Sequence, residues 1–195
     1  MGTEATDKRA ATDVELLRVA AAGDVAGFEQ LYRLYAQRVF QYVHLLVGDP
    51  ATAEEVVGDT MVAVWRGAGS FSHGSRVSTW ILGIARHKAL DALRRAGRQR
   101  YHVTLEEAMH LANSQDGAVE ELNRKQQANL TQQALSMLSP EHQEILRLVF
   151  YEELPYDEIG VLLSIPTNTV KTRVFYAKQQ LKKRLEQLSS KEAIR

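Results

Sequence analysis

The residues between Thr167 and Lys178 have side chains that can bind DNA. Lys and Arg side chains can contact phosphates or guanine, Asn and Thr can hydrogen-bond to base edges, and exposed rings can contact thymine methyl groups. If this stretch is a helix, its outward face consists of Thr167, Asn168, Lys171, Thr172, Phe175, Tyr176 and Gln179, with Arg173 and Lys178 at the edges. From this segment alone, the alternative is an ordinary helical hairpin with a polar surface.

Apolar residues predict how this stretch is held. They recur at helical spacing in two sets, Ile159, Leu162 and Leu163 in one segment and Val170, Val174, Ala177 and Leu181 in the next. Between the two sets, Ser164, Ile165 and Pro166 interrupt the pattern. A short first helix whose apolar face packs across a second helix is a helix-turn-helix. We therefore predict this motif, with helices over residues 156–163 and 167–188.

Residues typical of catalytic and metal sites are scattered along the chain. The six histidines are His44, His73, His87, His102, His110 and His142. The absence of cysteine excludes disulfides, Cys-ligated zinc and thiol nucleophiles. Glu106 and His110 can share a helix face with Glu107, but such a pair is usually a surface salt bridge. Because no Gly-rich phosphate loop is present either, we expect no enzyme, no metal and no cofactor.

Basic and acidic residues are segregated along a chain with 24 of each and a net charge of zero. Residues 86–100 contain six Lys or Arg and one acid, Asp91, and residues 171–184 contain six Lys or Arg and no acid. Residues 49–59 and 101–123 contain acids and neither Lys nor Arg. A single charge run is usually a solvated helix face, but two basic runs separated by acidic ones favour a nucleic-acid partner.

Nearly the whole chain has the periodicity of amphipathic helices, and no strand-like alternation is long enough for a sheet. The other predicted helices are 24–47, 50 to about 66 with Asp49 as its cap, 78 or 79 to about 96, 119–137 and 140 to about 151. In the first three of these, the predicted core residues are Phe28, Leu31, Tyr32, Tyr35, Val39, Tyr42, Val43, Leu46, Ala53, Val56, Val57, Thr60, Met61, Val64, Trp80, Ile81, Ile84, Ala85, Ala89 and Leu93. The Gly- and Ser-rich residues 67–78 predict a loop. We therefore predict an all-α fold: two small helical bundles, 13–100 and 118–188, joined by a flexible linker, 101–117, with the helix-turn-helix in the C-terminal bundle.

Two parts of the chain resemble one family. The stretch "LSPEHQEILRLVFYEELPYDEIGVLLSIPTNTVKTRVFYAKQQLKKRL" closely resembles the promoter-binding C-terminal domain of bacterial extracytoplasmic-function (ECF) RNA polymerase sigma factors, a group of the sigma-70 family. "FEQLYRLYAQRVFQYVHLLVGDPATAEEVVGDTMVAVWRG" and "STWILGIARHKALDALRR" resemble the other conserved domain of that family. The resemblance implies a sigma factor that binds core RNA polymerase, directs it to promoters, helps to melt the minus-ten region and is controlled by an anti-sigma factor.

The resemblance also implies three binding surfaces. The helix with "AEEVVGDTMVAVW" would dock on the polymerase clamp through Glu54, Glu55, Asp59 and Trp65. The next loop and helix would capture a flipped minus-ten base and hold single-stranded DNA through Phe71, Ser72, His73, Arg76, Trp80, Arg86, Lys88, Arg94, Arg95 and Arg98. For Trp80, the alternative is a core anchor. The helix-turn-helix would read double-stranded minus-thirty-five DNA through Thr167, Asn168, Thr169, Lys171, Thr172, Arg173, Tyr176 and Lys178.

A few positions depart from the family pattern. Pro155 and Pro166 stand where Ser commonly caps the two helices of the motif, and Gly58 stands where a polar residue is expected. We expect Thr167 to take over as the cap of the second helix, so that this helix starts one residue later. Ser164 replaces a common turn glycine, and we expect it to adopt a left-handed conformation.

The main alternative is a stand-alone helix-turn-helix regulator that does not join polymerase. Such a regulator normally needs a dimer and a palindromic site, and the sequence shows no heptad seam for dimerisation. The expected partners are core RNA polymerase, promoter DNA and an anti-sigma factor. We expect a cytoplasmic protein without membrane insertion, held at the membrane only through an anti-sigma factor. The N-terminal sequence lacks a secretory apolar core, and no apolar run approaches the ~20 residues of a span.

Overall fold

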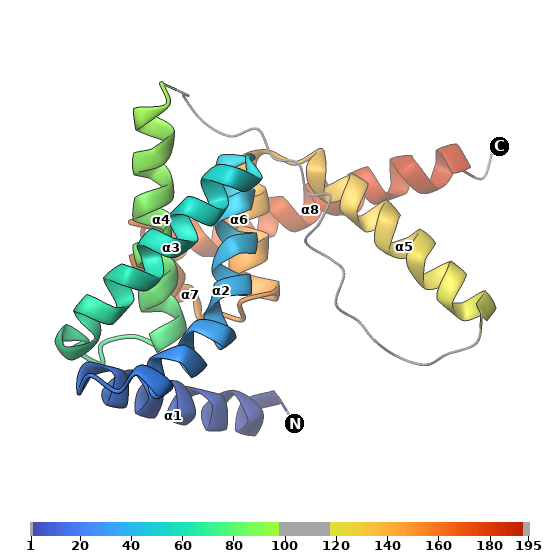
Figure 1. Ribbon diagram of the computed structural model, residues 1–195. Coiled ribbons are helices and arrows are strands. Elements are labelled where there is room, and N and C mark those ends of the chain that lie inside the picture. Colours follow the sequence, from blue (N-terminus) through green and yellow to red (C-terminus); the bar gives the residue numbers. More distant parts are fainter. Residues whose placement is uncertain (1, 98–117, 193–195) are drawn as a thin grey trace. The chain divides into compact units, whose positions relative to one another are not determined.

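The computed structural model describes residues 2–97 and 118–192 (Figure 1). The chain divides into two compact units, a first unit of residues 1–102 and a second unit of residues 103–195. Every regular element in the described residues is a helix, which confirms the predicted all-α class. The predicted linker 101–117 and the predicted DNA-binding residue Arg98 lie outside the described residues.

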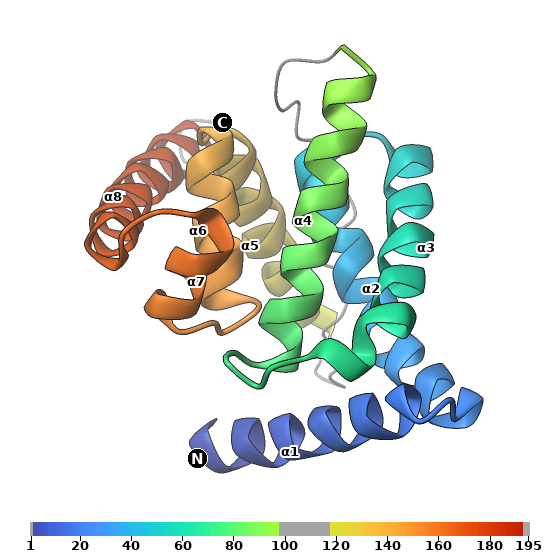
Figure 2. The same ribbon diagram turned by 90° about the vertical axis from the view of Figure 1, so that its left-hand side faces the viewer.

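The first unit is a bundle of three helices with a fourth across one end (Figure 2). In chain order, its elements are α1 (Gly2–Ala21), α2 (Val25–Val47), α3 (Pro50–Gly67), the 3₁₀ turn η1 (Ala68–Ser70) and α4 (Val77–Arg95). Helices α2, α3 and α4 pack against one another, and α1 runs across one end of them, beside the loop that joins η1 to α4 (Figures 1 and 2). This loop falls within the predicted loop 67–78.

Side-chain caps set the starts of α2 and α3. The Asp24 carboxylate accepts a hydrogen bond from the Ala26 backbone N–H at 2.9 Å. The Asp49 carboxylate accepts one from the Thr52 N–H at 2.8 Å, and Pro50 follows at the first helical position. Acceptors at these positions satisfy backbone donors that have no partner inside the helix. The predicted cap at Asp49 is therefore confirmed.

The core of the first unit follows the predicted apolar stripes. The predicted residues that are buried are Leu31, Tyr35, Val39, Tyr42, Val43, Leu46, Ala53, Val56, Val57, Thr60, Met61, Val64, Ile81, Ala85, Ala89 and Leu93. Of the other predicted core residues, Tyr32 is exposed, and Phe28, Trp80 and Ile84 are half-buried. No helix is predicted before residue 24, yet α1 buries Leu17 and Ala20 against the bundle.

The second unit contains the helix-turn-helix. Its helices are α5 (Ala118–Ser136), α6 (Pro140–Phe150), α7 (Tyr156–Leu163) and α8 (Thr167–Glu192). The Ser139 hydroxyl caps α6 by accepting a hydrogen bond from the His142 N–H at 3.4 Å. Helix α8 packs against each of the other three helices. The buried residues at their centre are Ala134, Ile145, Leu148, Ile159, Val170, Val174 and Ala177.

The turn between α7 and α8 is closed by backbone hydrogen bonds. Ser164 has φ 56° and ψ 45°, the expected left-handed conformation. The Ile165 N–H donates to the Gly160 carbonyl at 2.9 Å, and a Cβ on Gly160 would lie only 2.9 Å from the Ile165 carbonyl oxygen. This close approach explains the glycine, because any side chain at residue 160 would push the turn apart.

The expected late start of the second helix is wrong. Helix α8 includes Thr167, and the Pro166 carbonyl accepts a hydrogen bond from the Val170 N–H at 3.1 Å. Pro166 therefore occupies the cap position, since its carbonyl opens the helix although it has no side-chain acceptor.

A buried ion pair fixes the connection between α6 and α7. Arg147 Nη2 lies 3.2 Å from Glu152 Oε1, and the Glu152 side chain is fully buried. The Arg147 guanidinium also lies 4.3 Å from the centre of the Tyr151 ring. The Leu154 N–H donates to the Leu148 carbonyl at 3.0 Å. These contacts anchor residues 151–154 to α6, directly before the helix-turn-helix.

Candidate nucleic-acid and protein interfaces

Helix α8 presents a polar face to solvent. Of the predicted DNA-contacting residues, Asn168, Thr169, Lys171, Thr172, Tyr176 and Lys178 are exposed, while Thr167 and Arg173 are half-buried. On the opposite side of the helix, Val170, Val174 and Ala177 are buried. Because the apolar side holds α8 in the unit, the polar side is available for a partner along more than two helical turns.

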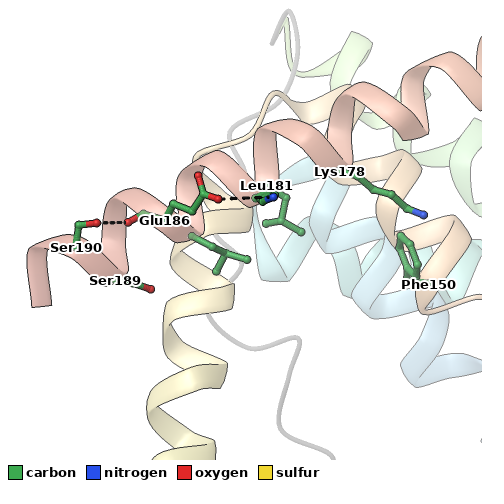
Figure 3. A pocket seen from close by; sticks show the side chains of 8 residues that line it. Phe150, Lys178, Leu181, Glu186, Ser189 and Ser190 are labelled. Atoms are coloured by element: carbon green, nitrogen blue, oxygen red, sulfur yellow. Dashed lines mark hydrogen bonds and ion pairs between the residues drawn. The ribbon is translucent and has the colours of Figure 1, made fainter. Parts of the chain in front are cut away.

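Contacts within the second unit orient parts of this polar face. The Thr172 hydroxyl donates to the Asn168 carbonyl at 3.0 Å, so that its hydrogen points back toward the helix. The Phe175 and Tyr176 rings are both exposed, with centroids 5.5 Å apart. Lys178 Nζ lies 4.8 Å from the centre of the exposed Phe150 ring, at the mouth of a groove along α8 (Figure 3). Lys178 thus points toward the end of α6.

Three aromatic rings gather where the loop enters α4. The Phe71 ring lies 4.9 Å from the His73 ring and 5.4 Å from the Trp80 ring, centroid to centroid. We call Phe71, His73 and Trp80 the ring cluster. His73 is exposed, whereas Phe71 and Trp80 are half-buried, so the cluster is open to solvent on one side. An exposed aromatic ring in such a cluster can stack against an unpaired base.

The backbone of the loop supports the ring cluster. His73 has φ 57°, a left-handed conformation that is uncommon for residues other than glycine. The Trp80 ring covers Gly67, since a Cβ on that glycine would lie 3.3 Å from Trp80 Cζ2. The Trp80 ring therefore packs on the bundle at Gly67, while the side chain remains half-exposed.

The basic residues of α4 lie beside two carboxylates. Arg94 and Arg95 are exposed, and Arg86, Lys88 and, before the helix, Arg76 are half-buried. Asp91 accepts a hydrogen bond from Arg94, and its carboxylate lies 4.0 Å from His87 Nε2. Lys88 Nζ lies 3.9 Å from Asp59 Oδ2 on the neighbouring helix α3. The basic surface is thus partly neutralised by acids that touch it.

Helix α3 carries an exposed acidic face. Glu54, Glu55 and Asp59 are exposed, while the apolar residues on the other side of the helix are buried. Gly58, within this face, leaves open space, because a Cβ there would meet no atom within 4 Å. The fourth predicted residue, Trp65, is half-buried, with its ring packed edge-on against Phe28 at 4.8 Å.

One exposed residue beside the acidic face of α3 was not predicted from the sequence. Val62 follows Asp59 by three residues and Glu55 by seven, so it lies on the same side of the helix. Its side chain is 48% exposed, unusual for valine in a helix packed on two neighbours. Its position in the sequence could have predicted this exposure, because Val62 does not belong to the apolar stripe that the buried residues of α3 form.

The described part of the chain contains no group of three or more His, Asp or Glu side chains placed to hold a metal ion. In the same residues, no helix combines the length and hydropathy needed to cross a bilayer.

These features define the class of the protein: two helical units, one with a helix-turn-helix, and both with exposed charged surfaces. Comparison with protein families matches residues 31–99 to sigma-70 region 2 and residues 134–183 to sigma-70 region 4. The ECF RNA polymerase sigma factor SigE of Mycolicibacterium smegmatis is 30% identical over 89% of this chain and 68% of its own length. SigW of Bacillus subtilis, named likewise, is 26% identical over 85% of this chain and 92% of its own length.

The chain belongs to the sigma-70 family, in the group of ECF RNA polymerase sigma factors. It therefore acts in transcription initiation, with core RNA polymerase and promoter DNA as partners, and its family is not one of enzymes in the catalytic sense.

Two solved structures share the fold. The sigma factor RpoE of Bartonella quintana, in complex with the anti-sigma factor NepR, has a TM-score of 0.62 at 23% identity and covers 83% of this chain and 98% of its own. CnrH, in complex with the cytosolic domain of CnrY, has a TM-score of 0.62 at 21% identity and covers 90% of this chain and 97% of its own.

Proposed function

We propose that the polar face of α8 reads the minus-thirty-five element in the major groove. This assignment covers Thr167, Asn168, Thr169, Lys171, Thr172, Arg173, Tyr176 and Lys178. The supporting observation is that the polar side of α8 is exposed directly opposite its buried apolar stripe. A helix held in this way can enter the major groove, about 12 Å wide, without losing its packing. Within this face, Asn168 can read a base edge and Lys171 can hold a phosphate.

The ring cluster captures a flipped minus-ten base. The Phe71 ring lies 4.9 Å from the His73 ring and 5.4 Å from the Trp80 ring, and His73 and the neighbouring Ser72 are exposed. Stacking on such rings is worth about 1–3 kcal/mol per base, which helps to offset the cost of unstacking it. The basic residues Arg76, Arg86, Lys88, Arg94 and Arg95 hold the phosphates of the separated strand. Arg98 continues this basic series in the sequence.

The acidic face of α3 binds the clamp of core polymerase. Glu54, Glu55 and Asp59 supply carboxylates that meet basic polymerase side chains. The open space at Gly58 allows a partner to approach the helix closely, and the exposed Val62 adds apolar area to this face. Trp65, whose ring packs edge-on against Phe28, supports this contact.

An anti-sigma factor controls the protein. The protein acts in the cytoplasm and is held at the membrane only when such an inhibitor is membrane-bound. The support is indirect: the RpoE and CnrH structures were both solved in complex with another protein, which for RpoE is the anti-sigma factor NepR. The chain has no catalytic activity of its own in this role.

Run-off transcription tests the function. Purified protein is added to core RNA polymerase with a pool of random promoter sequences, and the selected promoters are sequenced. We expect a defined minus-ten and minus-thirty-five pair, with no transcript in the absence of the protein. A transcript pattern independent of the protein would contradict the proposal.

Two variants distinguish residues of α8 that contact phosphates from residues that recognise bases. Lys171→Ala removes a phosphate contact, so we expect weaker binding to all promoters and a salt slope reduced by about one. Asn168→Ala removes a base contact, so we expect the preference at one minus-thirty-five position to relax, at a cost of about 1–3 kcal/mol on the preferred base. If Asn168→Ala leaves the selected sequence unchanged, this residue does not read the element.

A further inference from the structure

The first unit contains a buried polar pair that none of the three surfaces uses. The Tyr35 hydroxyl of α2 donates to the Asp13 carboxylate of α1 at 2.5 Å. Asp13 is 6% exposed and Tyr35 is 1% exposed. A buried carboxylate is costly unless it accepts hydrogen bonds, so this bond ties α1 to the bundle at a defined place. It joins residues 22 positions apart.

The same helix lies against the turn that leads into the ring cluster. Beyond Asp13, Leu17 and Ala20 of α1 are buried. Helix α1 contacts η1 and α4, and a Cβ on Gly69 of η1 would lie 4.0 Å from the Ala21 Cβ. In both ribbon views, α1 runs alongside the loop between η1 and α4 (Figures 1 and 2). Helix α1 thus packs directly against this turn.

Two hydrogen bonds connect the turn to the first ring. The Ser70 hydroxyl donates to the Gly67 carbonyl at 2.8 Å, and the Phe71 N–H donates to the Ala68 carbonyl at 3.4 Å. Phe71 then contacts both other rings of the cluster. A displacement of η1 therefore displaces Phe71, and a misplacement of about 1 Å can remove most of the benefit of a positioned group.

We propose that Asp13 and Tyr35 are positioning residues for promoter melting: their hydrogen bond sets α1 against the bundle, and α1 in turn holds η1 and the ring cluster where a flipped base can stack. This inference rests on the proposed function of the ring cluster. It assigns a role in strand opening to α1, a helix outside the residues matched by the region 2 model.

Pre-opened promoters test this role. Full-length variants are assayed with core polymerase on a promoter selected by the unmodified protein, once as duplex and once with an unpaired minus-ten region. Tyr35→Phe removes only the hydroxyl. We expect about tenfold less transcript from the duplex, the scale of one hydrogen bond to a charged group, and close to normal transcript from the pre-opened template. Asp13→Ala should behave like Tyr35→Phe, whereas Asp13→Asn retains an acceptor oxygen and should restore most activity.

The control lies on the same helix. Glu15 is exposed and pairs only on the surface with Arg18 at 2.7 Å, so Glu15→Gln should leave both templates unaffected. Equal losses on the duplex and the pre-opened template in Tyr35→Phe would overturn the inference, since they indicate general instability. Phe71→Ala provides the separate check: if it melts promoters normally, the proposed function of the ring cluster fails, whatever Tyr35→Phe does.

Hydrogen exchange provides a measurement independent of transcription. In the Tyr35→Phe protein, we expect amide exchange to accelerate in residues 68–76, while α3 keeps its protection. Unchanged exchange in residues 68–76 would also overturn the inference, because the pair would then not hold the turn.

Discussion

At the scale of single residues, one ion pair connects two of the proposed surfaces. Lys88, assigned to minus-ten phosphates, lies 3.9 Å from Asp59, assigned to the polymerase clamp. Asp59 is more than half exposed and Lys88 about one-third exposed, so the pair is screened by solvent and worth at most about 1 kcal/mol. If polymerase engages Asp59 as proposed, this contact releases Lys88 to bind DNA. Clamp binding and DNA binding are then coupled through a single contact.

Two charge-matched variants test this coupling. Asp59→Asn removes the partner of Lys88, so we expect the core-free protein to bind a single-stranded minus-ten oligonucleotide about two- to fivefold more tightly. Glu55→Gln changes the net charge equally on the same helix and serves as the control. Fluorescence anisotropy at fixed ionic strength measures both. Equal gains in the two variants would mean that only net charge matters.

At the scale of elements, α3 tolerates a glycine in its middle. Gly58 lies inside the helix, and a Cβ there would meet no atom within 4 Å. Glycine at an interior helix position costs about 0.5–1 kcal/mol relative to alanine. The open position therefore lowers the stability of α3 without any packing benefit inside the chain, which is consistent with a partner that approaches closely at the acidic face.

Alanine at residue 58 separates these effects. We expect Gly58→Ala to raise the free energy of unfolding of the first unit by about 0.5–1 kcal/mol and to weaken binding to core polymerase. Gly83→Ala is the control, since Gly83 also has open space around its Cβ position but lies in α4. It should stabilise similarly and leave core binding unchanged. Thermal unfolding and a competition assay for core enzyme measure the two quantities. Normal core binding by Gly58→Ala would argue against close approach at this position.

The turn of the helix-turn-helix stores strain at Ser164. Its φ of 56° costs a residue with a side chain about 1–2 kcal/mol, and glycine removes this cost. We expect Ser164→Gly to stabilise the second unit by about 1 kcal/mol and Ser164→Val to destabilise it by more, because a β-branched residue fits this region poorly. Denaturant unfolding checks both. Promoter preference should not change in Ser164→Gly, since residue 164 lies outside the polar face of α8.

The helices that the sequence predicted well share a continuous apolar stripe. In α3, all six residues predicted as core are buried, and residues 156–163 form α7 as predicted. Helix α1 was missed because its stripe is sparse and because one of its buried side chains is a carboxylate, Asp13, whose partner lies in another helix. The contact of Lys178 with Phe150 could not be predicted from the sequence either, since it depends on how α6 and α8 pack. Periodicity predicts elements, whereas such pairings depend on tertiary structure.

At the scale of the whole chain, basic and acidic surfaces are separate within a net charge of zero. The exposed face of α8 is basic, whereas the first unit adds the acids of α3 and the Asp91 that neutralises Arg94. Affinity for DNA grows with the number of phosphates that Lys and Arg contact, and nearby carboxylates reduce it. We therefore expect the free chain to bind DNA weakly, and we expect polymerase to increase its DNA affinity by covering the acidic face as proposed.

Equilibrium binding of promoter DNA tests this dependence on polymerase. Without core enzyme, we expect the full chain to bind a selected promoter duplex no better than about 10⁻⁴–10⁻⁶ M at physiological salt, with little discrimination against a scrambled minus-thirty-five element. With core enzyme, we expect specific binding in the range of about 10⁻⁸ M or tighter. The triple variant Glu54→Gln, Glu55→Gln, Asp59→Asn should reduce the difference between the DNA affinities measured with and without core enzyme. It should strengthen DNA binding by the free chain and weaken the complex with core. Tight, specific binding by the unmodified free chain would show instead that its acidic residues do not restrain the polar face of α8.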